Sequence, residues 1–545
     1  MHDTNTGVTR RHFLRTTAAA AGALALPFSF AAGSSAPKYR RYNVTSEGGK
    51  KALASYAKGV EAMLRLPADH PQNWFRNAFI HLMDCPHGNW WFYVWHRGYV
   101  GYFEETIRNL SGDASFAMPY WDWTALPQIP DAMFDGVLTP ESAAFIPYTR
   151  NLAVFTSFAK QPLLEYWNGL THAQRAQLKA RGYTDFTLLW NDVTGYSPQQ
   201  DGGISGNIAY ANPCGSRYLT RDNPKLDPKT AYDVSPFVIY TGLAPTNFYN
   251  KVNDLSFTSA KTPSHNSMAS GANAFSVLEG LPHNKVHNCI GGVGPLDPGP
   301  YGNMTNFLSP VDPVFFLHHA NMDRLWDVWT RKQKALHLPY LPTGQDLQTL
   351  SSEPFLFYVN GRGEYVGNSQ AGEYLSTERF DYDYEPGFGE LIVGPANGGP
   401  TKVAMTPIRG SVHQGTVSIG VPTEAIRSHL AAGPTSSLIA EVTLARPREG
   451  SLTREFDVIV GAPADVITVE ADSPYYAGTV AFFGQMMSMP GMAGDATFSV
   501  PLPKTPEAFH TLGANATTAV NIRLVPAHGH GGKLPVLKSA LVRGG

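Results

Sequence analysis

The sequence predicts a mainly α-helical chain that ends in an all-β region, and three observations support this prediction. Apolar residues recur at helical spacing near the N-terminus and again in two segments near residues 280 and 320. From about residue 400 the pattern changes to short β-prone runs at even spacing, separated by turn residues. A length of 545 residues suits two or three hydrophobic cores, or one large domain that takes most of the chain.

The composition is that of an ordinary globular protein. Charged residues make up 16% of the chain and the formal net charge is -2, so nothing favours nucleic acid or an anionic membrane as a partner. The 25 Tyr, 29 Phe and 10 Trp predict an aromatic-rich interior. Three cysteines, Cys85, Cys214 and Cys289, are too few for a disulfide framework, because at most one pair can form.

Residues 1–36 have the pattern of an export signal. The segment Thr9–Arg15, TRRHFLR, holds paired arginines followed by Phe and Leu, and an alanine-rich apolar run with small residues near Ala32 comes next. This run is too short and too alanine-rich for a good membrane span. We expect a twin-arginine signal and a periplasmic or secreted protein; an N-terminal helix of the mature fold is the alternative.

The elements follow in order from spacing and from stop signals. Residues 44–65 have apolar residues at helical spacing, and Pro67 ends the helix. Residues 90–110 also predict a helix, and the segment MPYWDWTALPQIPD then predicts a loop. Residues 125–275 are rich in Pro, Gly, Asn and Ser, so we expect irregular connections with short helical pieces such as HAQRAQLKARG.

Helical spacing returns in two later segments before the β-prone region. These are FSVLEGLPHNKVHNCIGG and PVDPVFFLHHANMDRLWDVWTRKQKAL, the second opened by Asp312 and Pro313. We read residues from about 400 to 545 as a separate all-β sandwich or barrel and divide the chain into residues 1–36, 37–390 and 391–545. The β-prone runs are SLIAEVTL, REFDVIVGA, DVITVEA, GTVAFF, ATFSVPL and AVNIRLVPA.

Seven of the 18 histidines fall in two short windows, a clustering typical of a metal site. In the later window, His283 and His287 are four residues apart, so on a helix they share one face. His318 and His319 are about 100° apart on a helix, so only one of them can face the metal in the same way. We choose His319 as the ligand, and a supporting hydrogen bond behind the site is the role expected of His318. Asp323 shares the face of His319 and is expected to orient its imidazole.

The earlier window contains His81, His87 and His96. His87 and His96 are nine residues apart, which would place them on opposite faces of one helix. His87 is therefore expected on a loop, His81 at the end of the preceding helix, and His96 on the following one.

The two windows together provide two sets of three imidazoles without a carboxylate ligand. Catalytic zinc and iron sites commonly include a carboxylate or thiolate, although zinc also takes three histidines alone. Paired three-imidazole sites suit copper that cycles between two oxidation states and binds O2 between the metals. The alternative is that these histidines are ordinary buried polar residues.

These residues resemble the type-3 copper family, which includes tyrosinases, catechol oxidases (polyphenol oxidases) and molluscan haemocyanins. The segments MPYWDW, KYRRYNVTS, LEGLPHNKVHN and REFDVIV, and the pair Tyr382 and Tyr384, extend the resemblance over nearly all of residues 37–545. Tyr93 departs from the pattern, which usually has a smaller or aliphatic residue there. The first family motif is matched by His87, Phe92, Trp95, His96, Arg97 and Glu104, and the second by Asp312, Pro313, Phe315, His319 and Asp323.

The resemblance implies a four-helix bundle that holds two copper ions, followed by a C-terminal β domain that shields the site. It also implies roles for single residues, each with a plainer alternative. Cys85 matches a residue that forms a thioether with the histidine two positions later, here His87; otherwise it is a buried thiol. Phe307 resembles an aromatic gate over the second copper, or a core residue. Glu279 and Asn284 resemble a pair that holds a water able to accept a phenol proton, or capping and surface residues.

By the same resemblance, the expected partners are small phenols and O2. The expected activity is that of a tyrosinase, which hydroxylates monophenols at the ortho position and oxidises o-diphenols to o-quinones. A catechol oxidase with little activity on monophenols, an o-aminophenol oxidase and a haemocyanin-like O2 carrier are the alternatives. A copper chaperone is a candidate partner, and the oligomeric state stays open.

The shielding domain is expected to cover the copper site with an inserted side chain. Residues 481–492, AFFGQMMSMPGM, are the candidate plug, and trimming the chain after about residue 390 is expected to raise activity. Thioethers are soft ligands, so the methionines of this segment could instead pass Cu(I) to the site, or simply pack. They are Met486, Met487, Met489 and Met492.

Overall fold

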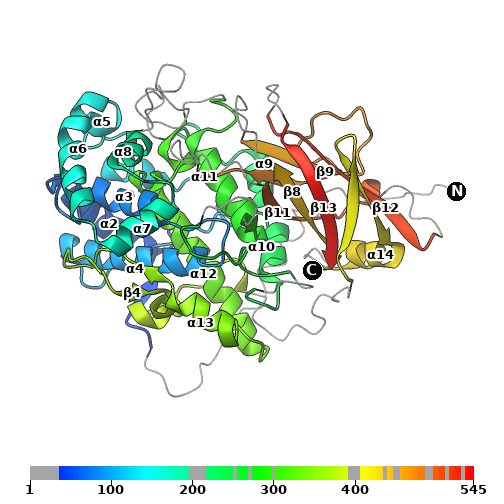
Figure 1. The fold of residues 1–545 in the computed structure, drawn as a ribbon, viewed down its shortest axis with the longest axis horizontal. Coiled ribbons are helices and arrows are strands. Elements are labelled where there is room, and N and C mark those ends of the chain that lie inside the picture. The colour runs from blue at the N-terminus through cyan, green and yellow to red at the C-terminus, as the bar shows by residue number, and fades with distance from the viewer. Residues whose placement is uncertain are drawn as a thin grey trace.

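The structure is a computed structural model whose helical part and β part lie side by side along the long axis (Figure 1). Each part has its own hydrophobic core. The predicted fold class, mainly helical with a C-terminal β region, is confirmed. The structure describes residues 36–194, 217–249, 255–267, 273–297, 301–390, 405–433, 438–445, 454–484, 495–509, 515–528 and 534–544. The predicted signal, apart from residue 36, and Cys214 lie outside these ranges, and the domain boundary at residue 390 stays a prediction.

Four helices form the centre of the helical part and carry the clustered histidines. Asn73 starts the first of them, because its side-chain oxygen accepts the N–H groups of Phe75 and Arg76. The last one has Pro313 at its cap position, and Asp312 just before it accepts the N–H of Val314 at 3.0 Å. The four helices are α3 (Trp74–Asp84), α4 (Phe92–Ser111), α11 (Asn284–Gly291) and α12 (Val314–Ala335).

A π-helical turn, η4 (Glu279–His283), precedes α11 where the sequence predicts a regular helix. Pro282 lies inside this turn and has no N–H to donate, so the regular hydrogen-bond ladder cannot form there. Turns of this kind often occur at functional sites. The local change of pitch sets the direction of His283 relative to His287.

Residues 146–194 are more helical than predicted. The Pro- and Asn-containing segment there forms four consecutive helices, because packing against the aromatic core outweighs weak local preference. These are α5 (Ile146–Thr149), α6 (Leu152–Gly169), α7 (His172–Ala180) and α8 (Phe186–Thr194). The other α-helices of this part among the described residues are α2 (Glu47–Arg65), α9 (Pro228–Asp233), α10 (Pro236–Leu243) and α13 (Gly344–Ser352). Two small sheets pair β1 (Tyr39–Arg41) with β5 (Tyr382–Tyr384), and β3 (Pro354–Phe355) with β4 (Ser369–Gln370).

The C-terminal region forms most of one nine-stranded sheet with the order β10-β9-β12-β7-β6-β13-β8-β11-β2. The predicted run DVITVEA is not a strand, whereas the other predicted runs are. The strands are β6 (Ile408–His413), β7 (Thr416–Pro422), β8 (Leu438–Ala445), β9 (Glu455–Val460), β10 (Tyr476–Ala481), β11 (Asp495–Pro501), β12 (Thr517–Pro526) and β13 (Val536–Gly544), with helix α14 (Thr423–Ala431) after β7.

The ninth strand, β2 (Asn273–Phe275), comes from the helical part of the chain. It pairs in parallel with β11, and the rings of Phe275 and Phe498 stack at 4.9 Å between centroids. On its other side, the carbonyl of Ala274 accepts the N–H of Ala260 at 2.9 Å, and the carbonyl of Ala260 accepts the N–H of Trp90 at 2.9 Å. Backbone hydrogen bonds through Ala260 therefore connect the edge of the sheet to the loop that follows His87. Among the described residues, no helix is both long and apolar enough to cross a membrane.

Candidate metal centre

The six histidines chosen from the sequence meet in the buried space between α3, α4, α11 and α12. The Nε2 atoms of His81 and His96 lie 3.3 Å apart, as do those of His287 and His319. The rings of His96 and His319 stack between the two groups at a centroid distance of 4.2 Å. The two sets of imidazoles thus face each other across one site.

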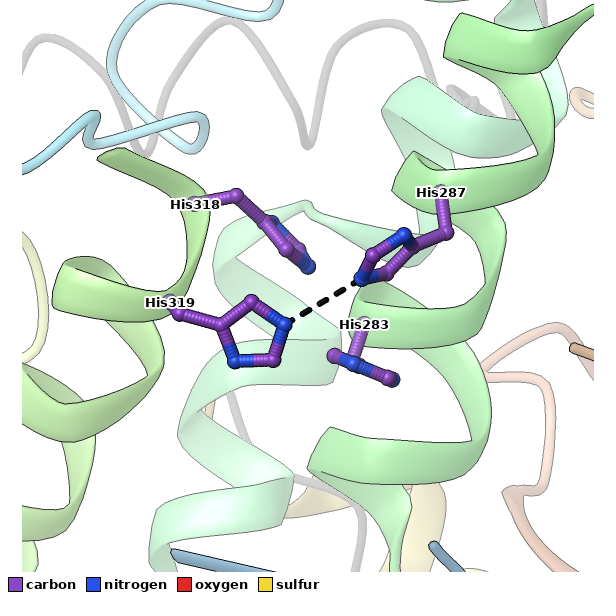
Figure 2. Close-up of side chains that lie close together, drawn as sticks. All are labelled: His283, His287, His318 and His319. Carbon is purple, nitrogen blue, oxygen red and sulfur yellow. Dashed lines mark hydrogen bonds between the residues drawn. The ribbon is translucent and has the colours of Figure 1, made fainter. Parts of the chain in front are cut away.

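Each set draws its members from the elements that the spacing predicts, with one refinement. His87 lies on the loop between α3 and α4, and His96 lies on α4. His81 lies inside α3, three residues before its end, rather than as its last residue. The later set comes from the π turn, from α11 and from α12 (Figure 2).

Backbone carbonyls fix the orientation of three of these rings. The Nδ1 atoms of His81, His96 and His287 each lie 2.7 Å from a carbonyl oxygen, those of Phe307, Phe92 and Met304. Because a carbonyl only accepts, each Nδ1 carries the proton and each Nε2 presents its lone pair to the site. A hydrogen bond from the other ring nitrogen to a backbone carbonyl is usual for a histidine that binds a metal.

Asn284 orients the ring of His283 in the same way. Its amide nitrogen donates to the carbonyl of Ala481 at 2.8 Å, so its oxygen faces His283 and accepts the Nδ1–H at 2.9 Å. The Nε2 atoms of His87 and His283 are buried and have no hydrogen-bond partner within the described residues. Unpartnered lone pairs at these two positions fit a metal ligand.

Burial keeps the whole cluster neutral. It lowers the pKa of His96 and of His283 to about 3 and lowers the pKa of the other ligands well below the usual value. Neutral imidazole is the form that binds metal. A donor set of imidazoles without a carboxylate fits two copper ions.

His318 is not placed as expected. The sequence predicts that it donates or accepts a hydrogen bond behind the site. Both of its ring nitrogens are buried without a partner in the described part of the chain, and the ring lies with those of His283, His287 and His319 (Figure 2).

Asp323 also differs from expectation, because it contacts arginines rather than an imidazole. One oxygen accepts from Arg97 at 2.7 Å, and the other accepts from Arg41 at 2.9 Å and from the hydroxyls of Tyr382 and Tyr384. Arg41 also pairs with Glu104 at 2.7 Å. This buried network ties β1 and β5 to α4 and α12, so Asp323 supports the helices and not the ring of His319.

Cys85 lies beside His87 as the sequence suggests. Its Sγ is 3.5 Å from the Nδ1 of His87 and 3.1 Å from the Nη2 of Arg181. Arg181 is fully buried and also donates to the carbonyls of Leu82 and Cys85 at 2.9 and 2.7 Å. Burial raises the pKa of the Cys85 thiol to about 12. Arg181 was not singled out in the sequence, because nothing local marks its contact with a loop about a hundred residues earlier.

Glu279 lies at the first position of the π turn with its carboxylate directed toward the His87 loop. One oxygen accepts the N–H of Gly88 at 2.6 Å and the other accepts the hydroxyl of Ser259. Burial raises the pKa of Glu279 to about 8. A carboxyl group with a pKa near neutrality can exchange a proton at working pH.

The C-terminal region reaches the site through Phe483, a residue of the predicted plug segment. Its ring lies 4.2 Å from that of His287, 4.9 Å from that of His87 and 5.6 Å from that of Phe307, centroid to centroid. Gly484 follows in a left-handed conformation, where a Cβ would lie 2.3 Å from Phe307. Residues 485–492, with the four methionines, lie outside the described ranges.

Comparisons of the sequence with known proteins all point to one family. Residues 65–332 match the model of the common central domain of tyrosinase. The chain is 27% identical over 378 residues to tyrosinase HcTyr1 of Hahella sp. (strain CCB-MM4), covering 63% of each chain. It is 24% identical over 353 residues to the chloroplastic polyphenol oxidase II of Ipomoea batatas, covering 62% of this chain and 48% of that protein.

The fold comparison extends further along the chain. The solved structure of a recombinant latent aurone synthase, a polyphenol oxidase, matches with a TM-score of 0.50 at 18% identity, covering 96% of this chain and 92% of that one. This match concerns the fold, and it includes both the helical part and the β part. In sequence, the chain spans about half to two thirds of the length of the curated relatives named above.

Proposed function

Since residues 65–332 belong to the tyrosinase family, we propose that the protein is a type-3 copper phenol oxidase that uses O2 to hydroxylate monophenols and to oxidise o-diphenols to o-quinones. The observation that carries this proposal is the meeting of two imidazole sets in one buried site. His81, His87 and His96, whose ring centroids lie 5.4 to 5.5 Å apart, would hold one ion. His283, His287 and His319 would hold the other. When bound, the copper pair supplies the binding and reduction of O2.

The substrate ring would lie where Phe483 lies in this structure. That position is bordered by the imidazoles of His87, His283 and His287 and by the ring of Phe307. A phenyl ring fits there because a phenylalanine already does. Phe307, predicted as a gate over the second copper, has its ring beside the first histidine set instead, 5.2 Å from that of His87 and 6.2 Å from that of His81 between centroids. The surrounding apolar side chains would exclude water.

Glu279 and Asn284 would together polarise the water that accepts the phenol proton. A phenol with a pKa near 10 needs a base at neutral pH, and a buried carboxylate with a pKa of about 8 is well matched to that task. Asn284, which contacts Ala481 in the shielded protein, becomes free to bind a water when that segment moves away. Together the two residues support hydroxylation, and hence a tyrosinase rather than a catechol oxidase.

The β region would act as a shield that keeps the enzyme latent. Phe483 fills the substrate position, and β2 and β11 join the two parts in one sheet. We assign residues 37–390 to the catalytic domain and 391–545 to the shield. Residues 1–36 would direct twin-arginine export, which carries folded, metal-loaded proteins to a periplasmic or secreted location.

A colour assay with counted copper tests the proposal. Copper-loaded protein in which Phe483 no longer fills the substrate position is given tyrosine, catechol and o-aminophenol, and oxygen uptake is recorded. We expect two copper ions per chain and turnover of tyrosine and catechol. Turnover of catechol alone would identify a catechol oxidase, and faster turnover of o-aminophenol would identify an aminophenol oxidase. Reversible O2 absorption without any turnover would identify an O2 carrier.

A further inference from the structure

We propose that Ser259 is a positioning residue, whose hydroxyl holds the carboxylate of Glu279 in place for the hydroxylation of monophenols. The inference rests on the proposed function and deepens it, because it names the side chain on which the geometry of Glu279 depends. Ser259 would act through Glu279, without touching the substrate or the metal ions.

The contacts of the Glu279 carboxylate are the first argument. Its side chain is fully buried, and one oxygen accepts the backbone N–H of Gly88 at 2.6 Å. The other oxygen accepts the hydroxyl of Ser259. Within the described residues no ion pair holds this carboxylate, so two uncharged donors fix its two oxygens. Gly88 contributes through its backbone, so Ser259 is the donor that a substitution can remove.

The hydroxyl of Ser259 is itself oriented toward Glu279. Its oxygen accepts the backbone N–H of Ser276 at 3.0 Å, and its single hydrogen is donated to the carboxylate. The hydroxyl of Ser276 is a poorer acceptor for that hydrogen, because it lies 3.5 Å away and carries no charge. Ser259 is only 3% exposed, so bulk water does not compete for this hydrogen bond.

The backbone on each side of Ser259 is also anchored. Thr258 donates to the carbonyl of Phe248 through both its N–H and its hydroxyl, each at 3.0 Å. Ala260 donates its N–H to the carbonyl of Ala274 in β2 at 2.9 Å. Such support matters, because a displacement of about 1 Å in a catalytic group can lower a rate by about 100-fold.

The competing explanation is that the Ser259 hydroxyl merely ties its own segment to the N–H of Ser276. Its loss would then loosen the loop that follows His87, which the same segment contacts through Ala260. Such loosening would lower the oxidation of monophenols and diphenols alike. An effect through Glu279 would lower hydroxylation selectively, because a diphenol depends less on removal of its proton by the protein.

The test compares Ser259→Ala with Ser259→Thr, which keeps the hydroxyl. Both are made in copper-loaded Phe483→Ala protein, whose substrate position is open, and the rates on tyrosine and on catechol are measured. Ser276→Ala is the matched control. It removes a hydroxyl of similar burial and keeps the backbone N–H that Ser259 accepts.

A second comparison combines Ser259→Ala with Glu279→Gln. The rates of the single and double variants are measured, as are the melting temperatures of the copper-free proteins. Two residues that act as a unit give effects that do not add. This comparison therefore tests the coupling of Ser259 to Glu279 without relying on activity alone.

We expect Ser259→Ala to lower tyrosine hydroxylation by about tenfold or more and to change catechol oxidation by less than about twofold. Ser259→Thr and Ser276→Ala should hydroxylate tyrosine as the parent does. In the Glu279→Gln background, Ser259→Ala should cause no further loss of hydroxylation. The changes in melting temperature should likewise not add.

An equal fall with both substrates would overturn the inference and leave the proposed function in place. A loss in Ser259→Thr as large as that in Ser259→Ala, or additive effects of Ser259→Ala and Glu279→Gln, would overturn it in the same way. Turnover of catechol alone by the Phe483→Ala parent would remove the hydroxylation that Ser259 is inferred to support. Turnover of neither substrate by copper-loaded parent would overturn the proposed function, and the inference with it.

Discussion

The ring of Phe483, at the end of the β part, lies against the imidazole of His287, with the two centroids 4.2 Å apart. The shield thus reaches the metal-binding side chains themselves and not merely the rim of the site. Among the described residues of the β part, Phe483 alone belongs to the core of the helical part.

Replacing Phe483 by Ala should activate the full-length protein. Removing the ring opens the substrate position, so we expect the rate on small o-diphenols at low concentration to rise by about tenfold or more, as the competent fraction grows. Phe482→Ala is the control, because Phe482 packs against Phe456 and Phe498 inside the β part. Equal rates for the two variants would show that Phe483 does not restrict access.

Cutting the chain between residues 390 and 405 should not by itself release the shield. Lys285 pairs with Glu455 at 2.5 Å and Lys229 pairs with Asp457 at 2.7 Å, with Lys285 and Glu455 both buried. The pairing of β2 with β11 also persists after a cut. We expect the two pieces to elute together in size-exclusion chromatography and to stay latent.

Glu455→Gln in the cut protein is the companion variant. It removes the carboxylate paired with buried Lys285, which then keeps only the electrostatic influence of Asp227 and Asp233. Breaking a buried pair typically costs about 3–5 kcal/mol. We expect the two pieces to separate and catechol oxidation to rise. Separation of the unsubstituted pieces immediately after cutting would mean that the connecting segment, and not the interface, holds the shield in place.

Glu279→Gln should remove hydroxylation while sparing diphenol oxidation. In a Phe483→Ala background we expect tyrosine hydroxylation to fall by about 100-fold and catechol oxidation to change little, because a diphenol depends less on a base. Burial raises the pKa of Glu279 to about 8, and the carboxylate form dominates above that pH. The hydroxylation that depends on Glu279 should therefore rise as the pH passes through about 8. A pH profile of hydroxylation that is the same in both proteins would exclude Glu279 from the deprotonation of the phenol.

The raised pKa of Glu279 also predicts that the parent and the Glu279→Gln variant differ in thermal stability as the pH changes. The folded pKa of about 8 lies above the ordinary value of 4.5, so Glu279 stabilises the fold below about pH 4.5 and this contribution is lost as the pH rises through 8. Glu279→Gln should therefore gain thermal stability relative to the parent between pH 6 and pH 9. Parallel melting curves of the two proteins over this range would contradict the shift.

Local spacing was enough to predict the elements that carry His87, His96, His287 and His319, because a ligand on a helix or loop is fixed by its near neighbours. Long-range contacts were not predictable in this way. Local spacing does not predict the strand β2, since a three-residue strand is defined only by its pairing with β11. The helix face of Asp323 predicts a hydrogen bond to the imidazole of His319. In the structure its carboxylate pairs instead with the buried charges of Arg97 and Arg41.

The predicted thioether between Cys85 and His87 can be tested by mass. The Sγ atom lies 3.5 Å from the Nδ1 of His87, close enough for a bond to the ring after a small movement. Arg181 holds the loop by donating to the Cys85 carbonyl at 2.7 Å. Formation of the bond removes the thiol hydrogen and one ring C–H hydrogen, and O2, a co-substrate of the proposed activity, would take up both with their electrons to give H2O2. The peptide between Arg76 and Arg97 should then be lighter by two hydrogen atoms and should resist alkylation.

Cys289 provides the internal control for this measurement, because it is a buried free thiol that forms a hydrogen bond with Asp227. After denaturation it should be fully alkylated in both copper-free and copper-loaded protein. Arg181→Lys should lower the yield of the lighter peptide, since lysine cannot contact the Cys85 carbonyl and Sγ with separate N–H groups of a planar fork. Complete alkylation of Cys85 after copper loading in air would show that it is an ordinary buried thiol.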